Sequence, residues 1–433
     1  MRNQPRRSNR SLSLSREPRS QISVVLVLTL LSQGLYTSLM IRAGVGSSTE
    51  ASTEKAVDQA FARALSQAGI RQADMALIVF TAEHMPHQER LRNAVSHASN
   101  QAVVVGSSAA GILTGEGEVE GSHGIAVLAL ASDQLQANAF MFQSLRGHDA
   151  EAGAKIAKLA RSRLDNNLLT LLMPDSYNGQ AQEMLQGMQR EIGYSPVIGA
   201  GSSESGVAGA TFQLCNDQVA SNAVAGLHVS GSFGSFIDIT QGCQPITEPL
   251  TITRADGNII YEIDDRPAFE VFTSVLKGPL LDDLRRALMF VFVGLPADRR
   301  RNTVGGGEYL VRNIIGLDSE KKIIGVADEV TEGQAMIFTL RDGQRARDDL
   351  GQMLNRQAQR LAGKKPAFGV YFNCCARGAS LYGIPGIDSA YIRQMLGDFP
   401  LIGMFGGYEL APLGGANHLF AYTGVLALIA EEN

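Results

Sequence analysis

Hydrophobic and polar positions repeat along the chain in a fixed order of elements. Apolar residues at helical spacing over 56–65 predict an amphipathic helix that ends at Gly69, and the apolar run of 75–80 then predicts a buried strand. The elements that follow in this first predicted unit are a helix, a strand over 102–106, a Gly-rich loop over 106–111 and a strand over 124–131.

The same order of elements returns twice. The second predicted unit has a helix over about 151–164, a strand over 168–174, a helix over 181–188, a Gly-rich loop over 201–206 and a strand over 224–231. The third has a helix over about 343–361, a strand over 368–375, a helix over 391–396, a Gly-rich segment over 399–412 and a strand over 420–429. Because the whole order of helices and strands repeats, we expect the three units to superpose, with Gly106, Gly199 and Gly403 at equivalent strand ends.

The segment between the second and third predicted units is β-rich. Asp256 and Gly257 stand between alternating apolar residues, which is a strong hairpin signal. The expected fold class is α/β, locally α+β, with repeated α-β-α-β-β units that form helix-flanked sheets around this β-rich middle segment. The predicted parts are an extension (1–39), an N-terminal domain of two units (40–246) and a C-terminal domain (247–433) that holds the β-rich segment (247–342) and the third unit (343–433).

The composition is that of an ordinary globular protein. Of 433 residues, 45% are hydrophobic and 19% charged, and the formal net charge of -5 gives no reason to expect nucleic acid as a partner. The four cysteines make a poor disulfide framework for so long a chain, which favours a reducing compartment, the cytoplasm.

The first 39 residues differ from the rest. An Arg- and Ser-rich segment precedes an apolar stretch over 22–39. The fully apolar run within this stretch is too short to span a bilayer. We interpret residues 1–39 as an extension upstream of a start at Met40, with a membrane anchor through 22–39 as the alternative.

Several motifs resemble those of the FIST N-terminal and C-terminal domains, a pair found in bacterial signal-transduction proteins. The N-terminal mark is the loop VVVGSSAAG, which ends at Gly111, and TITRADGNIIYEIDDRPAFEVF resembles the opening of the C-terminal part. NCCARG (373–378) resembles the family's Cys-x-x-Arg-Gly element, with Cys374 as the motif cysteine, and GMFGGYELAPLGG with YTGVLAL resembles its Gly-rich terminal block.

The resemblance implies a small-molecule sensor, with a ligand such as an amino acid or a small carboxylate. The repeats occupy the chain and leave no output domain, so a downstream signalling protein is the expected partner. A membrane partner is not expected. An interaction scaffold is a further alternative, and it predicts a large exposed apolar patch without a pocket.

The candidate ligand-binding residues lie on the Gly-rich loops. Backbone N–H groups and hydroxyls of a Gly-Ser-Ser loop at a strand end suit a carboxylate, although the glycines equally suit a tight turn. Arg377 and Glu409 follow strands of the third unit and suit the two ends of an amino acid, or else form a structural ion pair. The complete predicted site is Ser107, Ser108, Ser202, Ser203, Cys374, Arg377, Gly406, Gly407 and Glu409.

Catalysis, metals and cofactors find little support in the sequence. A thiolate at Cys374 near Arg377 suits a Cys-dependent enzyme or a thiol redox sensor, but no base and orienting residue can be assigned to it. His84 and His87 flank Pro86, which interrupts a helix that would align them. We therefore expect no metal, no cofactor and no catalytic residue.

Overall fold

The computed structural model describes residues 41–163, 167–206, 208–298, 300–305 and 307–431. The predicted extension over 1–39 lies outside these residues. Within them, no helix has both the length and the apolar character to cross a membrane.

Unit 1 shows how the sequence pattern sets the local structure. Helix α2 (Thr53–Ala68) begins after Ser52, whose side chain accepts a hydrogen bond from the Lys55 N–H, and it ends at Gly69, where φ is 64°. The apolar stripe of α2 is buried, as its spacing predicts. The other elements of unit 1 are β1 (Arg42–Ser48), β2 (Met75–Thr81), α3 (Gln88–Ser99), β3 (Val103–Ala109), β4 (Gly111–Thr114), β5 (Gly117–Glu120) and β6 (Ile125–Ala131).

Units 2 and 3 have the same elements. Unit 2 contains β7 (Leu135–Gln143), α4 (Asp149–Ala160), β8 (Asn167–Pro174), α5 (Ala181–Ile192), β9 (Val197–Ala200), β10 (Gln213–Cys215), β11 (Gln218–Ala220) and β12 (Ala223–Gly231). Unit 3 contains β13 (Gly234–Gln241), α9 (Gly343–Leu361), β23 (Phe368–Cys374), α10 (Ala379–Tyr382), α11 (Ile387–Leu396), β24 (Leu401–Gly406), β25 (Glu409–Leu413), β26 (Ala416–Phe420) and β27 (Thr423–Ala430).

Between β13 and α9 the chain forms a separate nine-stranded sheet, here called the inserted segment (243–341). Its strands are β14 (Cys243–Pro245), β15 (Leu250–Asp256), β16 (Ile259–Ile263), β17 (Arg266–Pro267), β18 (Val291–Pro296), β19 (Tyr309–Arg312), β20 (Ile314–Asp318), β21 (Ile323–Val326) and β22 (Ala335–Arg341). Its helices are α6 (Ala268–Val275), α7 (Pro279–Asp282) and α8 (Leu284–Ala287). The predicted hairpin at Gly257 is the β15–β16 pair.

The three units share one sheet topology, which confirms the expected class of repeated α/β units. The strand orders are β1-β6-β2-β3, β7-β12-β8-β9 and β13-β27-β23-β24, and in each the two inner strands that follow the helices are parallel. The sequence prediction missed the first strand of each unit. In unit 3 this strand, β13, pairs with β27, so the inserted segment lies within the third unit rather than before it. The domain boundaries at 246/247 and 342/343 stay predictions.

Strand register makes the three predicted glycines equivalent. Each lies on the third strand of its unit, and a Cβ added to it would collide with a backbone carbonyl oxygen of the neighbouring parallel strand. The pairs are Gly106 with Ile78, Gly199 with Leu172 and Gly403 with Tyr371. This register also shows that Ser107 corresponds to Ala200, so the two Gly-Ser-Ser loops are displaced by two positions rather than aligned.

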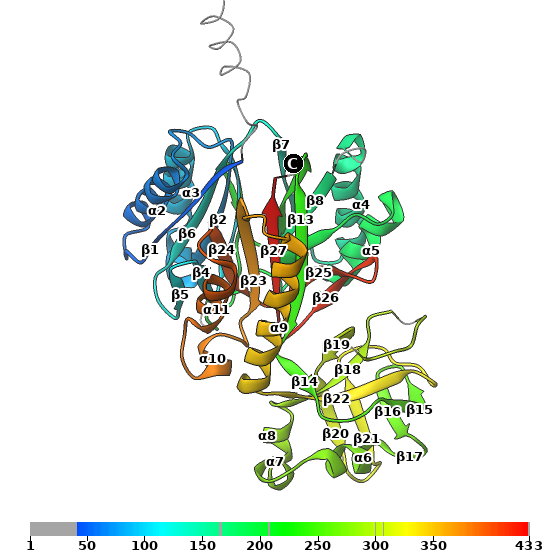
Figure 1. Cartoon of the computed structure of the whole chain (residues 1–433). Coiled ribbons are helices and arrows are strands. Elements are labelled where there is room, and N and C mark those ends of the chain that lie inside the picture. The colour runs from blue at the N-terminus through cyan, green and yellow to red at the C-terminus, as the bar shows by residue number, and fades with distance from the viewer. Residues whose placement is uncertain (1–40, 164–166, 207, 299, 306, 432–433) are drawn as a thin grey trace, which may run out of the picture. The chain divides into compact units, whose positions relative to one another are not determined.

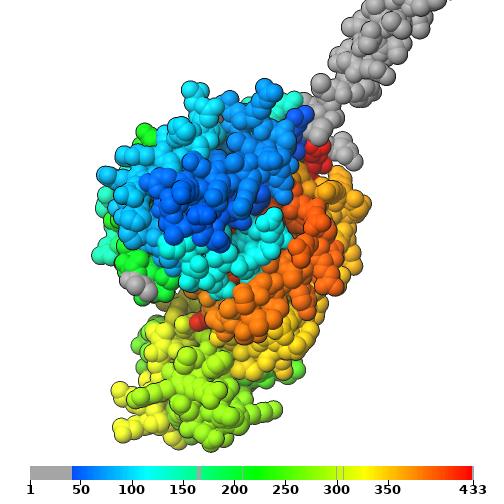
Figure 2. All heavy atoms as spheres, turned by 90° about the vertical axis from the view of Figure 1, so that its left-hand side faces the viewer, coloured from blue at the N-terminus to red at the C-terminus, as the bar shows by residue number. Residues whose placement is uncertain are grey.

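Each unit gives a hairpin to the sheet of another unit. Hairpin β4–β5 of unit 1 pairs with β24, β10–β11 of unit 2 with β3, and β25–β26 of unit 3 with β9. In Figure 2 the cyan hairpin β4–β5 lies between the blue helices of unit 1 and the orange chain of unit 3. The Glu118 carboxylate fixes it there by accepting hydrogen bonds from the backbone N–H of Gly386 (2.8 Å) and Ser389 (3.0 Å).

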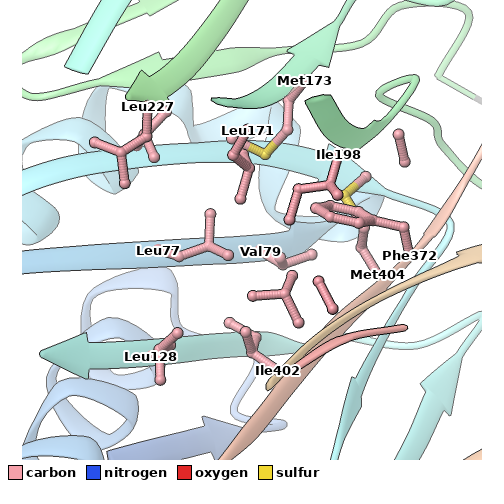
Figure 3. Packing of buried hydrophobic residues seen from close by; sticks show 14 of the residues in the cluster. Leu77, Val79, Leu128, Leu171, Met173, Ile198, Leu227, Phe372, Ile402 and Met404 are labelled. Carbon is pink, nitrogen blue, oxygen red and sulfur yellow. The ribbon is translucent and has the colours of Figure 1, made fainter. Parts of the chain in front are cut away.

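A shared apolar core lies where the inner faces of the three sheets meet (Figure 3). Leu77, Leu171 and Phe372 come from corresponding strands of units 1, 2 and 3 and belong to one buried cluster. The outer faces pack against helices, α2 and α3 in unit 1, α4 and α5 in unit 2, and α9 and α11 in unit 3. The predicted loop over 106–111 is instead almost entirely strand, because Gly106, Ser107 and Ser108 lie on β3 and pair with β2. In units 2 and 3 the chain leaves the sheet after β9 and after β24.

Candidate ligand-binding site

The predicted serines join the loops of units 1 and 2. Ser107 Oγ donates to Ser202 Oγ at 2.6 Å, and Ser108 Oγ donates to the Ser203 carbonyl at 3.1 Å. The Ala110 N–H donates to Ser203 Oγ at 2.8 Å. All four serines are buried, and their hydroxyls connect β3 of unit 1 to the segment that follows β9 of unit 2.

The loop of unit 3 joins the same region. Ser203 Oγ donates to the Phe405 carbonyl, and the Gly407 N–H donates to the Gly201 carbonyl at 2.9 Å. The Cys375 N–H donates to the Gly406 carbonyl at 2.8 Å. The structure thus brings the predicted loop residues of all three units together in one continuous region.

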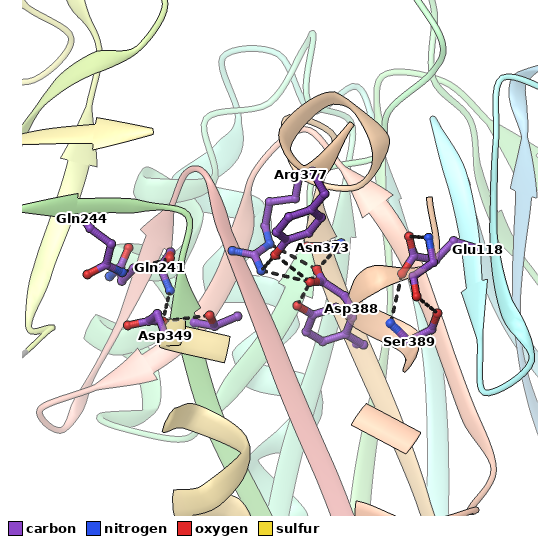
Figure 4. A network of polar contacts seen from close by, with 12 residues as sticks. Glu118, Gln241, Gln244, Asp349, Asn373, Arg377, Asp388 and Ser389 are labelled. Carbon is purple, nitrogen blue, oxygen red and sulfur yellow. Dashed lines mark hydrogen bonds and ion pairs between the residues drawn. The ribbon is translucent and has the colours of Figure 1, made fainter. Parts of the chain in front are cut away.

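Arg377 is held by a carboxylate that the sequence did not single out. Its Nε and Nη2 lie 3.3 Å and 3.2 Å from the Asp388 oxygens, and both side chains are fully buried (Figure 4). Asp388 also accepts from Tyr371 Oη (3.0 Å), Asn373 Nδ2 (2.9 Å) and Tyr382 Oη (2.8 Å). Burial and the Asp388 charge raise the pKa of Tyr371, so it stays a hydrogen-bond donor.

Glu409 is buried beside this network without an ion pair to Arg377 among the described residues. Its Oε2 accepts from the backbone N–H (3.2 Å) and Oγ1 (2.7 Å) of Thr423, while Oε1 has no hydrogen-bond partner within the described chain. Burial raises the pKa of Glu409 well above its ordinary value, and the nearby Cys374 thiol raises it further. The predicted pair is therefore close in space, but each member has its own partner.

The two adjacent cysteines have different environments. Cys374 is buried and Cys375 is exposed. A hydrogen bond from the Cys374 thiol lowers the pKa of Cys375 and, together with burial, raises the pKa of Cys374. The thiol that solvent reaches is thus the neighbour of the predicted motif cysteine.

A cleft of about 1230 Å³ begins at the Gly-rich loop of unit 3. Gly407 and Tyr408 form part of its wall, the glutamines of α5 form another part, and the inserted segment lies across from them. Arg312 of β19 connects the inserted segment to the hairpin of unit 3, because its Nη1 donates to the Leu419 carbonyl of β26 at 3.4 Å. Its Nε lies 2.8 Å from the Asp328 carboxylate. The polar and charged lining residues are Gln180, Gln182, Gln186, Gln189, Asp298, Arg300, Arg312, Asn313, Asp328, Glu329, Tyr408 and His418.

No group of three or more His, Cys, Asp or Glu side chains in the described part of the chain has an arrangement suited to a metal ion. His84 is fully buried; its Nδ1 lies 3.0 Å from Thr53 Oγ1, and its ring packs edge-on against His123. Burial lowers the pKa of His84 to about 4.

Comparison with known families agrees with these features. The FIST N domain matches residues 75–266, and the FIST C domain matches residues 268–412. The chain belongs to the FIST family. Domains of this family are generally ligand-binding modules of signal transduction.

Relatives of this FIST protein occur in mycobacteria. "Uncharacterized protein Rv0628c" of Mycobacterium tuberculosis is 28% identical over 391 residues, which is 90% of this chain and 100% of the relative. "Uncharacterized protein Mb0898c" of Mycobacterium bovis is 27% identical over 392 residues, with the same coverage.

Two solved structures are more distantly similar. A cyanuric acid hydrolase from A. caulinodans aligns with a TM-score of 0.38 and 9% identity, over 91% of this chain and 100% of the hydrolase. A chorismatase aligns with a TM-score of 0.33 and 7% identity, over 90% of this chain and 98% of the chorismatase. Similarity at this level supports no statement about the activity of the FIST chain.

Sequence reasoning missed Asp388, Arg312 and Asp328 in this FIST protein. Asp388 is the second residue of α11, and an acidic residue in the first turn of a helix is expected without any special role. Arg312 reaches the cleft only because β19 packs against a hairpin about a hundred residues later in the chain. No local sequence signal marks either relationship.

Proposed function

We propose that this FIST protein binds a small zwitterion or carboxylate, such as an amino acid, in the cleft beside Gly407 and reports its occupancy to a separate signalling protein in the cytoplasm. The observation that carries the proposal is the cleft itself. It starts at a predicted ligand loop, and charges of both signs line it. A concave site with a few placed polar groups is the usual form of a small-molecule site.

Arg312 is the residue that we assign to the ligand carboxylate. Its side chain is 12% exposed, and its hydrogen bonds to protein atoms within the described chain use Nε and Nη1. Nη2 is therefore the guanidinium nitrogen left for a ligand. The Asp298 carboxylate, which also lines the cleft, favours an ammonium group at the other end of the ligand.

For the nine residues predicted from the sequence we propose two roles. Gly407 contacts the ligand, because it lines the cleft and is exposed. Gly406, the four serines, Cys374, Arg377 and Glu409 fix the loop that carries Gly407, since each is buried and most bond to a neighbouring loop or strand. Direct ligand contact by these buried residues stays a prediction.

The cleft also suits signal transfer. Its walls come from unit 2, from the hairpin that unit 3 gives to unit 2, and from the inserted segment. A ligand that contacts all three stabilises one arrangement of these walls relative to others. A partner protein that binds only that arrangement then responds to the ligand.

A thermal-shift screen of the twenty amino acids and of small dicarboxylates tests this proposal. A ligand that binds only the folded state at a hundred times its Kd stabilises it by about 2.7 kcal/mol, which is easily seen as a rise in Tm. Methyl esters and N-acetyl derivatives of any active amino acid serve as matched controls, because each removes one charge. If no compound raises Tm, or if the esters act as well as the free acids, the proposed ligand class is wrong.

Thiol chemistry at Cys375 is the second candidate, favoured by the exposure and lowered pKa of that thiol. Iodoacetamide should then label Cys375 alone in the folded protein, and C375S should abolish the labelling whereas C215S leaves it unchanged. Ligand binding that survives C375S supports the sensor, whereas turnover that disappears in C375S supports the enzyme.

A further inference from the structure

A second cleft, of about 780 Å³, is lined by residues of the inserted segment and by Arg345 of α9. It shares no lining residue with the cleft beside Gly407. Its volume lies in the range of small-molecule sites. Its apolar lining residues are Pro245, Ile246, Pro249, Val275, Leu276, Leu280, Val291, Val304, Ile337 and Leu340.

The walls of this cleft come from two separate apolar clusters. Leu276 and Val291 belong to the main core of the inserted segment, whereas Val304 and Ile337 belong to a smaller cluster around Cys243. These four side chains are almost completely buried, so the apolar surface that the cleft offers comes from partly exposed residues, Ile246, Val275, Leu280 and Leu340. A hydrocarbon or aromatic group placed there covers these side chains and leaves water.

Charge is present only at the edge of the cleft. Lys277, next to α6, and Arg345, in the first turn of α9, both line the cleft and are exposed, and Glu248 is the one acidic lining residue. Arg345 Nη1 donates to the Pro245 carbonyl at 3.1 Å. Neither cation forms an ion pair within the described residues, so the apolar cleft has an excess of positive charge.

We propose that this cleft binds an amphipathic monocarboxylate, with its apolar body against the partly exposed apolar residues and its carboxylate at Lys277 and Arg345. The two cations come from different elements and distinguish an anionic head group from a neutral or cationic one. A folded partner protein is a poor candidate, because a stable protein interface buries far more surface area than a cleft of this size offers.

This site goes beyond the proposed sensor function and does not depend on it. The ligand classes differ, since the cleft beside Gly407 has polar walls and charges of both signs. Because the second cleft lies between the inserted segment and the first turn of α9, its occupant contacts both the segment and unit 3.

Calorimetric titration with sodium decanoate, below its micellar concentration, tests the proposal on the full chain. Decanol and decylamine are matched probes with the same apolar body and a neutral or cationic head. We expect saturable binding of one decanoate per chain, decanol at least tenfold weaker, and no binding of decylamine. Equal affinity for all three, or no saturable decanoate binding, would overturn the proposal.

Two variant pairs locate the binding. K277Q/R345Q should weaken decanoate binding at least tenfold, whereas K364Q/K365Q, which removes two exposed lysines outside the cleft, should leave it unchanged. L280W places a large side chain in the cleft wall and should also weaken binding, whereas L281W at the exposed neighbour should not. Folding of each variant is checked by its Tm and circular dichroism. Unchanged affinity in folded K277Q/R345Q and L280W would show that decanoate binds elsewhere and would refute the site.

Discussion

The Arg377 guanidinium and the Asp388 carboxylate form an ion pair with an Nη2–Oδ1 distance of 3.2 Å, and neither side chain is exposed to solvent. The pair connects the turn after β23 to the first turn of α11. Because water cannot solvate either charge, each depends on the other and on the surrounding hydroxyl and amide donors.

Breaking this pair should therefore destabilise the fold. We expect R377M and D388N each to lower the free energy of unfolding by about 3–5 kcal/mol, because each leaves one buried charge without its partner. The double variant should lose less than the sum of the two. Urea denaturation measures all three.

The matched control for this prediction is K155Q, which removes an exposed ion pair with Glu151 and should change stability by less than about 1 kcal/mol. If R377M and D388N lower the free energy of unfolding as little as K155Q does, the buried pair does not hold the turn after β23.

The equivalent glycines predict a second effect on stability. G199A should destabilise the protein by about 2 kcal/mol or more, because the new methyl group collides with the Leu172 carbonyl and the parallel strands must move apart. G351A is the control, since nothing lies within 4 Å of a Cβ at this interior position of α9. There alanine should stabilise the helix by about 0.5–1 kcal/mol. Equal effects of the two substitutions in denaturation experiments would contradict the strand register.

The sequence predicted most of the repeat but little of its assembly. Helical spacing and apolar runs are local signals, so the helices and inner strands of each unit, and the equivalence of Gly106, Gly199 and Gly403, were accessible. The hairpin exchange was not, because it joins distant segments such as Glu118 and Ser389, 271 positions apart. Local periodicity also cannot choose which sheet a hairpin joins.

The sequence predicted which residues form the candidate region but not which partners each of them contacts. The predicted residues of the three units lie close together, as the hydrogen bonds from Ser107 to Ser202 and from Ser203 to the Phe405 carbonyl show, whereas their contact with a ligand stays a prediction. The partners of Arg377 and Glu409 depend on side chains that project from other elements, Asp388 from α11 and Thr423 from β27. The cleft beside Gly407 forms only when the inserted segment packs near α5, which no motif indicates.

His84 predicts a specific pH dependence of stability. Its pKa is lowered from 6.5 to about 4 in the folded chain, so the unfolded chain binds a proton more readily between these values. The neutral ring therefore contributes stability above pH 6.5, and this contribution, about 3 kcal/mol by linkage, is lost as the pH falls to about 4.

The test compares the free energy of unfolding of wild type and H84Q from pH 4 to 7. Their difference should vary with pH, and it should be most favourable to wild type at the upper end. The matched control variant is H97Q, which replaces an exposed histidine by the same residue. A pH-independent difference for H84Q would mean that His84 is not held neutral by burial.

The central claim is that a small zwitterion or carboxylate binds beside Gly407. Calorimetry tests it most directly: the compound that raises Tm most is titrated into wild type, R312Q and R254Q. Arg254 forms an exposed ion pair with Glu262 outside the cleft, so R254Q removes the same charge without touching the site. The account predicts one ligand per chain, an affinity at least tenfold lower for folded R312Q, because a lost charge-assisted contact costs about 2–5 kcal/mol, and an unchanged affinity for R254Q. Wild-type affinity in R312Q, or an equal loss in both variants, would contradict it.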